Sequence, residues 1–143
     1  MTTLAVSVVT PEASLWSGEA TAFVARSREG DFTVLPQHTA TVGNLVSGVV
    51  RVDTAEGEVA FAVHGGFFRV SAGAAEGVTL ATVLASVAER TTDINVARAQ
   101  VAKEQAEAAL ADARNEPDDA TTRLLEGDLE RAELRLRAAG QAA

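Results

Sequence analysis

The stretch GDFTVLPQH, from Gly30 to His38, combines a short strand pattern with an abrupt stop. A glycine and an acidic residue open the stretch, an apolar run follows, and Pro36 comes directly after Leu35. Proline fixes φ at about −65° and has no N–H to donate to a sheet, so we expect a strand that ends at a rigid corner. Similar short runs, separated by glycines, lie on both sides of this stretch.

The first 90 residues show the period of two that is typical of strands. Its clearest examples are Leu4, Val6 and Val8; Val50 and Val52; Val59, Phe61 and Val63; Phe68 and Val70; and Val78, Leu80, Thr82 and Leu84. Glycines or acid–glycine pairs separate these runs, as they do between short antiparallel strands. Several runs are apolar on both faces, which favours two stacked sheets. We therefore predict an antiparallel β-sandwich over residues 1–90.

From Thr92 the period changes to that of a helix. One apolar face is predicted at Ile94, Ala97, Val101 and Ala108, and a second at Leu125, Leu129, Ala132 and Leu136. Between these segments, Pro117 disfavours helix at Glu116, and Asp118 or Asp119 can cap a new helix. The aromatic residues all precede this region. The sequence thus predicts an α+β chain in which an antiparallel two-helix hairpin occupies residues 91–143.

Alanine dominates the first predicted helix. Each buried CH₂ is worth only about 0.8 kcal/mol, so an alanine-rich face offers high helix propensity but little packing energy. A few kcal/mol is the scale on which a ligand can shift such an element between two arrangements. The hairpin is therefore a candidate switch.

Composition excludes several classes of protein. The chain has 143 residues, no cysteine, a net charge of −8 and a pI near 4.7. Disulfides and thiolate chemistry are excluded, and the negative charge disfavours nucleic acid or a bare anionic membrane as a partner. The N-terminus lacks the pattern of a signal peptide and no run is long enough to span a bilayer. We expect a cytosolic chain that meets a membrane only through another protein.

The sequence lacks the motifs of familiar catalytic sites. It contains no GxxxxGK[ST], HExxH or GxSxG pattern, and its only histidines are His38 and His64. Two histidines are too few for most zinc sites, so no metal site is predicted. Acidic and basic residues alternate on the predicted helices, as on an ordinary solvated face. These features argue against an autonomous enzyme.

Several segments, in order, resemble the epsilon subunit family of F-type ATP synthases over nearly the whole chain. They are LAVSVVTPEASLWSGEA (residues 4–20), GDFTVLPQH (30–38), VRV (50–52), HGGFFRV (64–70), TVLASVAER (82–90) and DINVARA (93–99). The resemblance implies a ten-stranded sandwich followed by two helices. It also implies a non-catalytic central-stalk subunit, peripheral on the cytoplasmic face of the plasma membrane.

In this family the sandwich links the gamma subunit to the membrane-embedded c-ring and so couples proton flow to ATP synthesis. The segment similar to Gly30–His38 forms one end of the sandwich, which rests on the ring. The resemblance therefore implies ring contacts by Asp31, Pro36 and His38. The alternative is that Asp31 and His38 only support the turn.

Some bacterial members bind ATP as a regulatory ligand through an [IL]DxxRA motif, and this sequence has INVARA from Ile94 to Ala99. The implied ATP-binding residues are Glu89, Ile94, Asn95, Arg98, Ala99, Arg131 and Arg135. Asn95 replaces the acidic residue of the motif and so removes a carboxylate acceptor. The alternative for Arg98 is a surface or docking role.

In the family the hairpin can extend toward the catalytic head and inhibit ATP hydrolysis, partly through basic residues. The candidate inhibitory contacts are Arg123, Arg131, Arg135 and Arg137. Residues 91–143 contain 7 basic and 11 acidic residues, so we expect weak inhibition. Two other classes stay open: a stand-alone ATP-sensing protein, and a protein-binding module with a helical arm.

Overall fold

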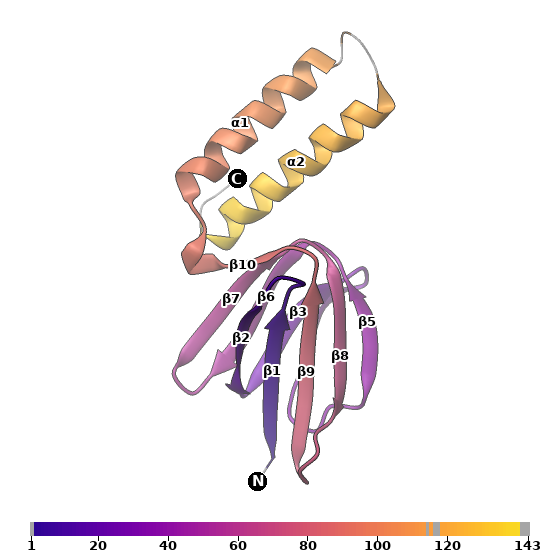
Figure 1. Cartoon of the computed structure of the whole chain (residues 1–143), viewed down its shortest axis with the longest axis vertical. Coiled ribbons are helices and arrows are strands. Elements are labelled where there is room, and N and C mark those ends of the chain that lie inside the picture. The colour runs from indigo at the N-terminus through magenta and orange to yellow at the C-terminus, as the bar shows by residue number, and fades with distance from the viewer. Residues whose placement is uncertain (1, 114, 116–117, 141–143) are drawn as a thin grey trace. The chain divides into compact units, whose positions relative to one another are not determined.

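The computed structural model describes residues 2–113, 115 and 118–140. The chain divides into two compact units, Met1–Arg90 and Thr91–Ala143. The first contains strands and the second contains helices (Figure 1).

Ten strands form within the described residues and make two five-stranded sheets, as predicted. The first sheet has the order β2-β1-β9-β8-β5 and the second has the order β10-β7-β6-β3-β4. The strands are β1 (Thr3–Val9), β2 (Ser14–Ala20), β3 (Ala22–Ser27), β4 (Gly30–Val34), β5 (Thr41–Leu45), β6 (Gly48–Thr54), β7 (Gly57–Val63), β8 (Gly66–Ala72), β9 (Val78–Ala85) and β10 (Ala88–Arg90).

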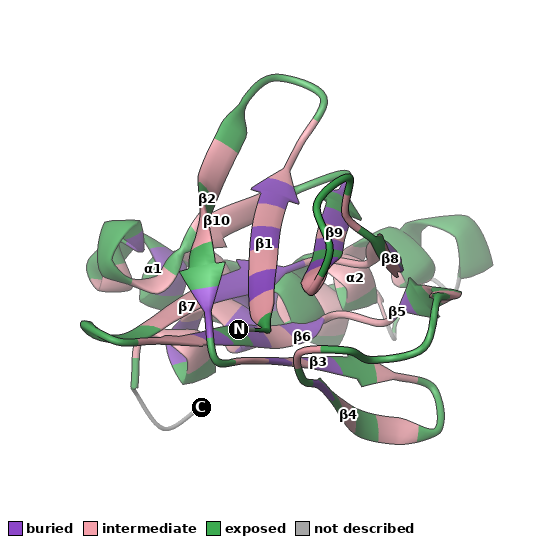
Figure 2. Cartoon of the chain, turned by 90° about the horizontal axis from the view of Figure 1, so that it is seen from below, coloured by how far each residue is buried: buried purple, intermediate pink, exposed green. Residues whose placement is uncertain are grey.

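The inward faces of the two sheets build a single hydrophobic core. Alternate residues of β1 and β9 are buried, and this alternation is visible as bands along β1 in Figure 2. Phe23 and Phe61 are the largest of the fully buried side chains. All members of this core, and the half-buried residues that pack against it, lie between Leu4 and Ala88.

One pair of strands corrects the sequence prediction, which made the whole sandwich antiparallel. Strands β1 and β9 pair in parallel, with Thr3 opposite Val78 and Val9 opposite Leu84. The hydrophobic alternation cannot reveal this direction, because both kinds of pairing place every second side chain inward. Parallel pairing is open to β1 and β9 since a long segment, rather than a tight turn, connects them.

The Gly65–Gly66 turn brings β8 against the end of β9. Both glycines have positive φ, at 83° and 148°, and a Cβ at Gly66 would collide with the carbonyl oxygen of Leu84. Only glycine fits there, which explains the paired glycines of the HGGFFRV stretch.

The second unit consists of a short 3₁₀ turn (Thr91–Asp93) followed by α1 (Val96–Ala113) and α2 (Asp119–Ala138). The two helices pack side by side and run in opposite directions, as expected (Figure 1). Asp118 caps α2 by accepting a hydrogen bond from the N–H of Ala120. The predicted break at Glu116 and Pro117 lies outside the described residues.

The apolar face predicted for α2 is confirmed in part and that for α1 is wrong. In α2, Ala132 and Leu136 are buried and Leu125 and Leu129 are half-buried, but Leu134, outside the predicted face, is buried as well. In α1 the buried residues are Ala99 and Ala106, whereas Val101 is 51% exposed. Alanines occur on several sides of α1, so the pattern could not select the side that packs.

Candidate functional site

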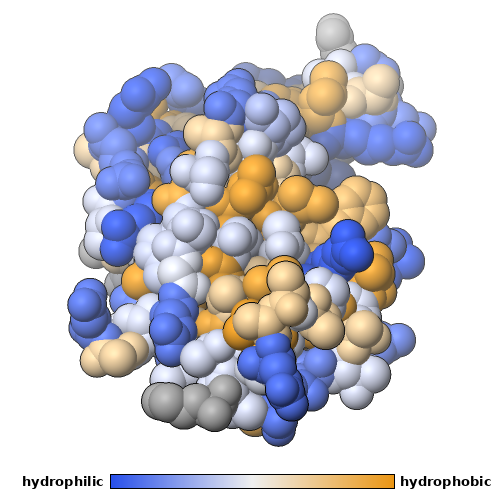
Figure 3. Space-filling view, turned by 60° about the horizontal axis from the view of Figure 1, so that its bottom comes forward, coloured by the Kyte–Doolittle hydropathy of each residue, from blue (hydrophilic) through white to orange (hydrophobic). Residues whose placement is uncertain are grey.

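The first candidate surface is the outer face of the sheet β2-β1-β9-β8-β5. Because the core takes alternate residues, the strand register places Val9, Leu84 and Phe67 in one outward-facing row. The large exposed apolar residues on this face are Val42 (72% exposed), Phe67 (57%), Leu84 (49%) and Leu80 (38%). We call these four residues the outer-face patch. Figure 3 shows hydrophobic residues gathered in the middle of the visible face, with hydrophilic residues around them.

The outer-face patch is suited to binding another protein. Fully burying one large apolar side chain is worth about 1.5–3 kcal/mol. A side chain that is exposed in the isolated chain contributes this free energy only when a partner covers it. Exposed clusters of such residues on a folded domain mark contact surfaces.

The second candidate surface, which we call the open edge, consists of the turn Ser27–Gly30, β4, β5 and the segment 35–40 that joins these two strands. Strands β4 and β5 are the outermost strands of their sheets. A shallow groove of about 510 Å³ lies along them and is lined by Ser27, Arg28, Glu29, Phe32, His38, Thr41, Val42, Gly43, Asn44 and Phe68. Charged and polar residues thus surround an aromatic floor.

The floor of the groove depends on Gly43. The rings of Phe32 and Phe68 lie with their centroids 4.4 Å apart. A Cβ at Gly43 would lie 2.5 Å from Cε1 of Phe68, so the absence of a side chain leaves room for this ring.

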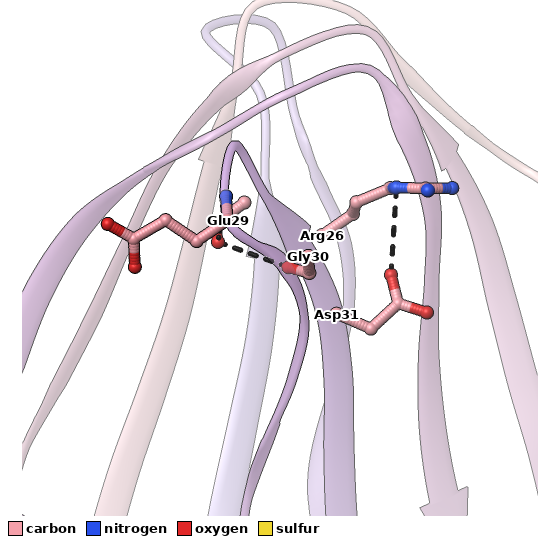
Figure 4. Close-up of polar contacts among 5 residues, drawn as sticks. Arg26, Glu29, Gly30 and Asp31 are labelled. Atoms are coloured by element: carbon pink, nitrogen blue, oxygen red, sulfur yellow. Dashed lines mark hydrogen bonds and ion pairs between the residues drawn. The ribbon is translucent and has the colours of Figure 1, made fainter.

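Asp31 forms an exposed ion pair with Arg26 on the neighbouring strand, with Nε and Oδ1 3.8 Å apart. Figure 4 shows these two side chains beside the turn that joins β3 and β4, where Ser27 Oγ donates to the carbonyl oxygen of Gly30. Both side chains of the pair are about 60% exposed (61% and 62%). Such pairs contribute only about 0–1 kcal/mol, so the Asp31 carboxylate can exchange Arg26 for a partner at little cost.

His38 ends a tight turn that begins at Leu35, and its N–H donates to the Leu35 carbonyl oxygen at 3.1 Å. The exposed ring holds Nδ1 2.8 Å from the carbonyl oxygen of Thr39. A carbonyl only accepts, so Nδ1 carries a proton and Nε2 is the ring atom that a partner can contact.

The structure confirms the strand and the corner predicted for Gly30–His38, because β4 is followed directly by the turn Leu35–His38. Asp31 lies near the start of β4, opposite Arg26, whereas Pro36 and His38 follow its other end. Five residues of extended chain separate Asp31 from Pro36 by about 16 Å. The GDFTV part of the stretch forms a complete edge strand, so these residues lie along the open edge and do not form one cluster.

In the helical unit, Arg98 and Arg135 come together from different helices. They line a shallow groove of about 430 Å³ with Ala97, Val101, Ala102 and Gln105. Two guanidinium groups at one groove are suited to holding the oxygens of a phosphate. Arg131, by contrast, pairs with Asp128 on its own helix.

Asn95 has a clear structural role at the start of α1. Its Oδ1 accepts a hydrogen bond from the N–H of Arg98 at 3.0 Å. Asparagine and aspartate cap helices about equally well, so the change from the acidic residue of the motif preserves the helix start. Ile94 and Ala99 are buried, while Glu89 lies half-buried in β10 of the other unit.

The remaining candidate residues belong to α2. Arg123, Arg131 and Arg137 are exposed and Arg135 is half-buried. Arg135 and Arg137 occupy the last turn, where positive charge is favourable for the helix dipole. At the other end, hydrogen bonds from Thr121 and Ala120 lower the pKa of Asp118, so this cap is ionised at neutral pH.

The described residues form neither a metal site nor a membrane-spanning helix. Among residues 2–113, 115 and 118–140, no three His, Asp or Glu side chains are placed to hold a metal ion. Within the same described ranges, neither helix is long and apolar enough to cross a membrane.

Sequence reasoning missed the outer-face patch. The signal was present in strands with apolar residues on both faces, such as Phe67 beside Phe68 and Leu80 beside Ala81. Apolar residues on both faces of a strand indicate stacked sheets, but stacking covers only the inner face of each sheet, so the outer residues stay exposed.

A β-sandwich with an exposed apolar face, followed by a helical hairpin, defines a protein that works through its surfaces. Comparison with known proteins narrows this class. Residues 3–91 match the family model described as the ATP synthase delta/epsilon chain β-sandwich domain. The chain is 40% identical over 136 residues to an ATP synthase epsilon chain of Streptomyces griseus, covering 94% of both chains. It is 35% identical over 130 residues to that of Pediococcus pentosaceus, covering 90% of this chain and 89% of the relative.

The chain therefore belongs to the ATP synthase delta/epsilon chain family. A chain in the mitochondrial ATP synthase of Euglena gracilis, solved with OSCP, F1 and the c-ring, has the same fold. The TM-score is 0.77 at 24% identity, covering 99% of this chain and 83% of the other.

Proposed function

We propose that this chain is the epsilon subunit of an F-type ATP synthase, a non-catalytic part of the central stalk that couples proton translocation to ATP synthesis. The observation that carries this proposal is the match to the epsilon chain of Streptomyces griseus over 94% of both sequences. The subunit links the gamma subunit to the c-ring, and the complex holds it at the cytoplasmic face of the plasma membrane.

The gamma subunit covers the outer-face patch. The isolated chain exposes four large apolar residues on this face: Val42, Phe67, Leu80 and Leu84. Permanent subunit interfaces are rich in such residues, because burying them there stabilises the complex. Phe67 lies directly opposite Leu84 on the neighbouring strand, so the two side chains offer one continuous apolar surface.

The c-ring contacts the open edge, with Asp31 near one end and Pro36 and His38 near the other. Loops that connect membrane-spanning helices lie in water and are polar, so they suit a surface of exposed charged and polar groups. The open edge offers such groups at Arg28, Glu29, Asp31 and His38. A contact along the whole edge engages both ends of β4.

The helical hairpin inhibits ATP hydrolysis when it extends toward the catalytic head. Two features support this role: the core of the sandwich is complete within residues 4–88, and exposed arginines occur along α2. Arg123, Arg131, Arg135 and Arg137 are the proposed contacts. Inhibition is weak, because Asp128 pairs with Arg131 and acidic residues outnumber basic ones in this unit.

ATP is a regulatory ligand of this chain. Arg98 and Arg135 provide the phosphate-binding groups, and Asn95 keeps the helix start that places Arg98. Ile94, Ala99 and Arg131 of the same helical unit complete the proposed set. When ATP binds, Arg131 leaves its ion pair with Asp128 and pairs with the ligand instead.

Replacing Phe67 by alanine is expected to weaken binding to purified gamma subunit by about thirtyfold, because a central aromatic contact is worth about 2 kcal/mol. Titration calorimetry measures this affinity. Leu124→Ala is the matched control, since Leu124 is 70% exposed but lies on α2. Unchanged binding by Phe67→Ala would remove gamma from the outer-face patch.

Removing the hairpin is expected to accelerate ATP hydrolysis by less than about fivefold, at the low end of typical coupling energies. The assay adds either the whole chain or a chain ending at Arg90 to a complex depleted of this subunit. Sedimentation of the complex checks that both forms are incorporated. Equal rates with both incorporated forms would contradict an inhibitory hairpin.

Millimolar ATP is expected to raise the melting temperature of the isolated chain by several degrees, because ligand at 100 times its Kd stabilises the native state by about 2.7 kcal/mol. Differential scanning fluorimetry measures the shift. Arg98→Gln should abolish it, while Arg123→Gln, a change of the same kind away from the groove, should retain it. No shift in the unmodified chain, or equal loss in both variants, would exclude the proposed ATP site.

A further inference from the structure

The corner after β4 is a strained turn. Pro36 and Gln37 are its two central residues, and Gln37 has φ of 70°. These are features of a type II turn, in which the second central residue has positive φ and is usually glycine or asparagine. Gln37 is the only residue other than glycine with positive φ in the part of the chain that the structure describes. Something outside the turn must therefore favour this conformation.

A buried threonine supplies that support. Thr79 lies in β9, and it is the only buried polar residue within the described ranges, at 5% exposure. Its Oγ1 accepts a hydrogen bond from the backbone N–H of Gln37 at 2.8 Å, across 42 positions of sequence. The hydrogen bond within the turn runs from the N–H of His38 to the carbonyl oxygen of Leu35. The N–H of Gln37 has no acceptor within the turn, so its acceptor must come from another segment.

We propose that Thr79 is a positioning residue that holds the turn Leu35–His38 in its left-handed form and thereby presents Pro36 and His38 to the c-ring. The inference rests on the proposed ring contact at the open edge. Thr79 touches no partner itself and acts only through Gln37.

The strand pairing of Thr79 fixes the position of its hydroxyl group. The residue is paired on both sides, with Leu4 of β1 and Ala72 of β8, so its backbone is fixed by two neighbouring strands. A hydroxyl held this way defines where the N–H of Gln37 can lie. The first sheet thus controls a turn that follows the edge strand of the second sheet.

The test compares Thr79→Val, which keeps the side-chain shape but removes the acceptor, with Thr79→Ser, which keeps the hydroxyl. NMR hydrogen exchange reports on the Gln37 amide, and rebinding of the reconstituted complex to membranes carrying the ring reports on the contact. Thr79→Val is expected to speed exchange at Gln37 by about tenfold and to weaken ring association by up to about tenfold, the range of one hydrogen bond. Affinity for purified gamma subunit stays unchanged, and Thr79→Ser behaves as the unmodified chain.

A second substitution provides the rescue. Gln37→Gly adopts positive φ without help, so in the Thr79→Val background it is expected to restore ring association. Gln37→Gly does not replace the hydrogen-bond acceptor that Thr79→Val removes. If it restores ring association, the defect of Thr79→Val lies in the conformation of the turn and not in a general loss of stability. Equal weakening of gamma and ring association by Thr79→Val, or no rescue by Gln37→Gly, would overturn the proposal.

His38→Ala distinguishes failure of this inference from failure of the ring contact. If His38→Ala weakens ring association and Thr79→Val does not, the ring contact stands and the positioning role is wrong. If neither His38→Ala nor Pro36→Ala changes ring association, this corner does not meet the ring, and the positioning role falls with it.

Discussion

Packing of the two inward sheet faces against each other is the interaction on which the rest of the structure depends. The core is closed by residues between Leu4 and Ala88, with Phe23 and Phe61 among its largest members. Because strands supply all of this burial, the helical hairpin is not needed to complete it. That independence is the physical requirement for a regulatory element that changes its arrangement while the sandwich keeps its contacts.

The same packing explains why one sheet keeps large apolar residues exposed on its outer face. A sandwich covers only one face of each sheet, so apolar residues on the opposite face stay exposed unless a partner covers them. Phe67 and Phe68 are neighbours in sequence, yet Phe68 is buried in the core and Phe67 lies outside. Adjacent residues of one strand thus differ in role: Phe68 packs in the core, while Phe67 stays on the surface as a proposed contact for a partner.

The sequence predicted the strands, the hairpin and the family, because each rests on local patterns: alternation, turn glycines, a helix cap at Asp118 or Asp119, and ordered motifs. It could not predict features that depend on how distant segments meet. The parallel pairing of β1 with β9 and the hydrogen bond from Gln37 to Thr79 are of this kind. The side on which α1 packs was missed because alanine marks no single face. Asp31 was grouped with His38 because both belong to one motif, although an extended strand keeps them apart.

Native-state hydrogen exchange on the whole chain tests most directly whether the sandwich is stable without the hairpin. Amides of α1 and α2 are expected to exchange through an opening of lower free energy than amides of β1, β6 and β9, which should exchange only on global unfolding. The two groups should then converge only at denaturant concentrations that unfold the sandwich. Exchange of helix and strand amides with one common free energy and one denaturant dependence would show a single cooperative unit, and would contradict a hairpin that can be released by itself.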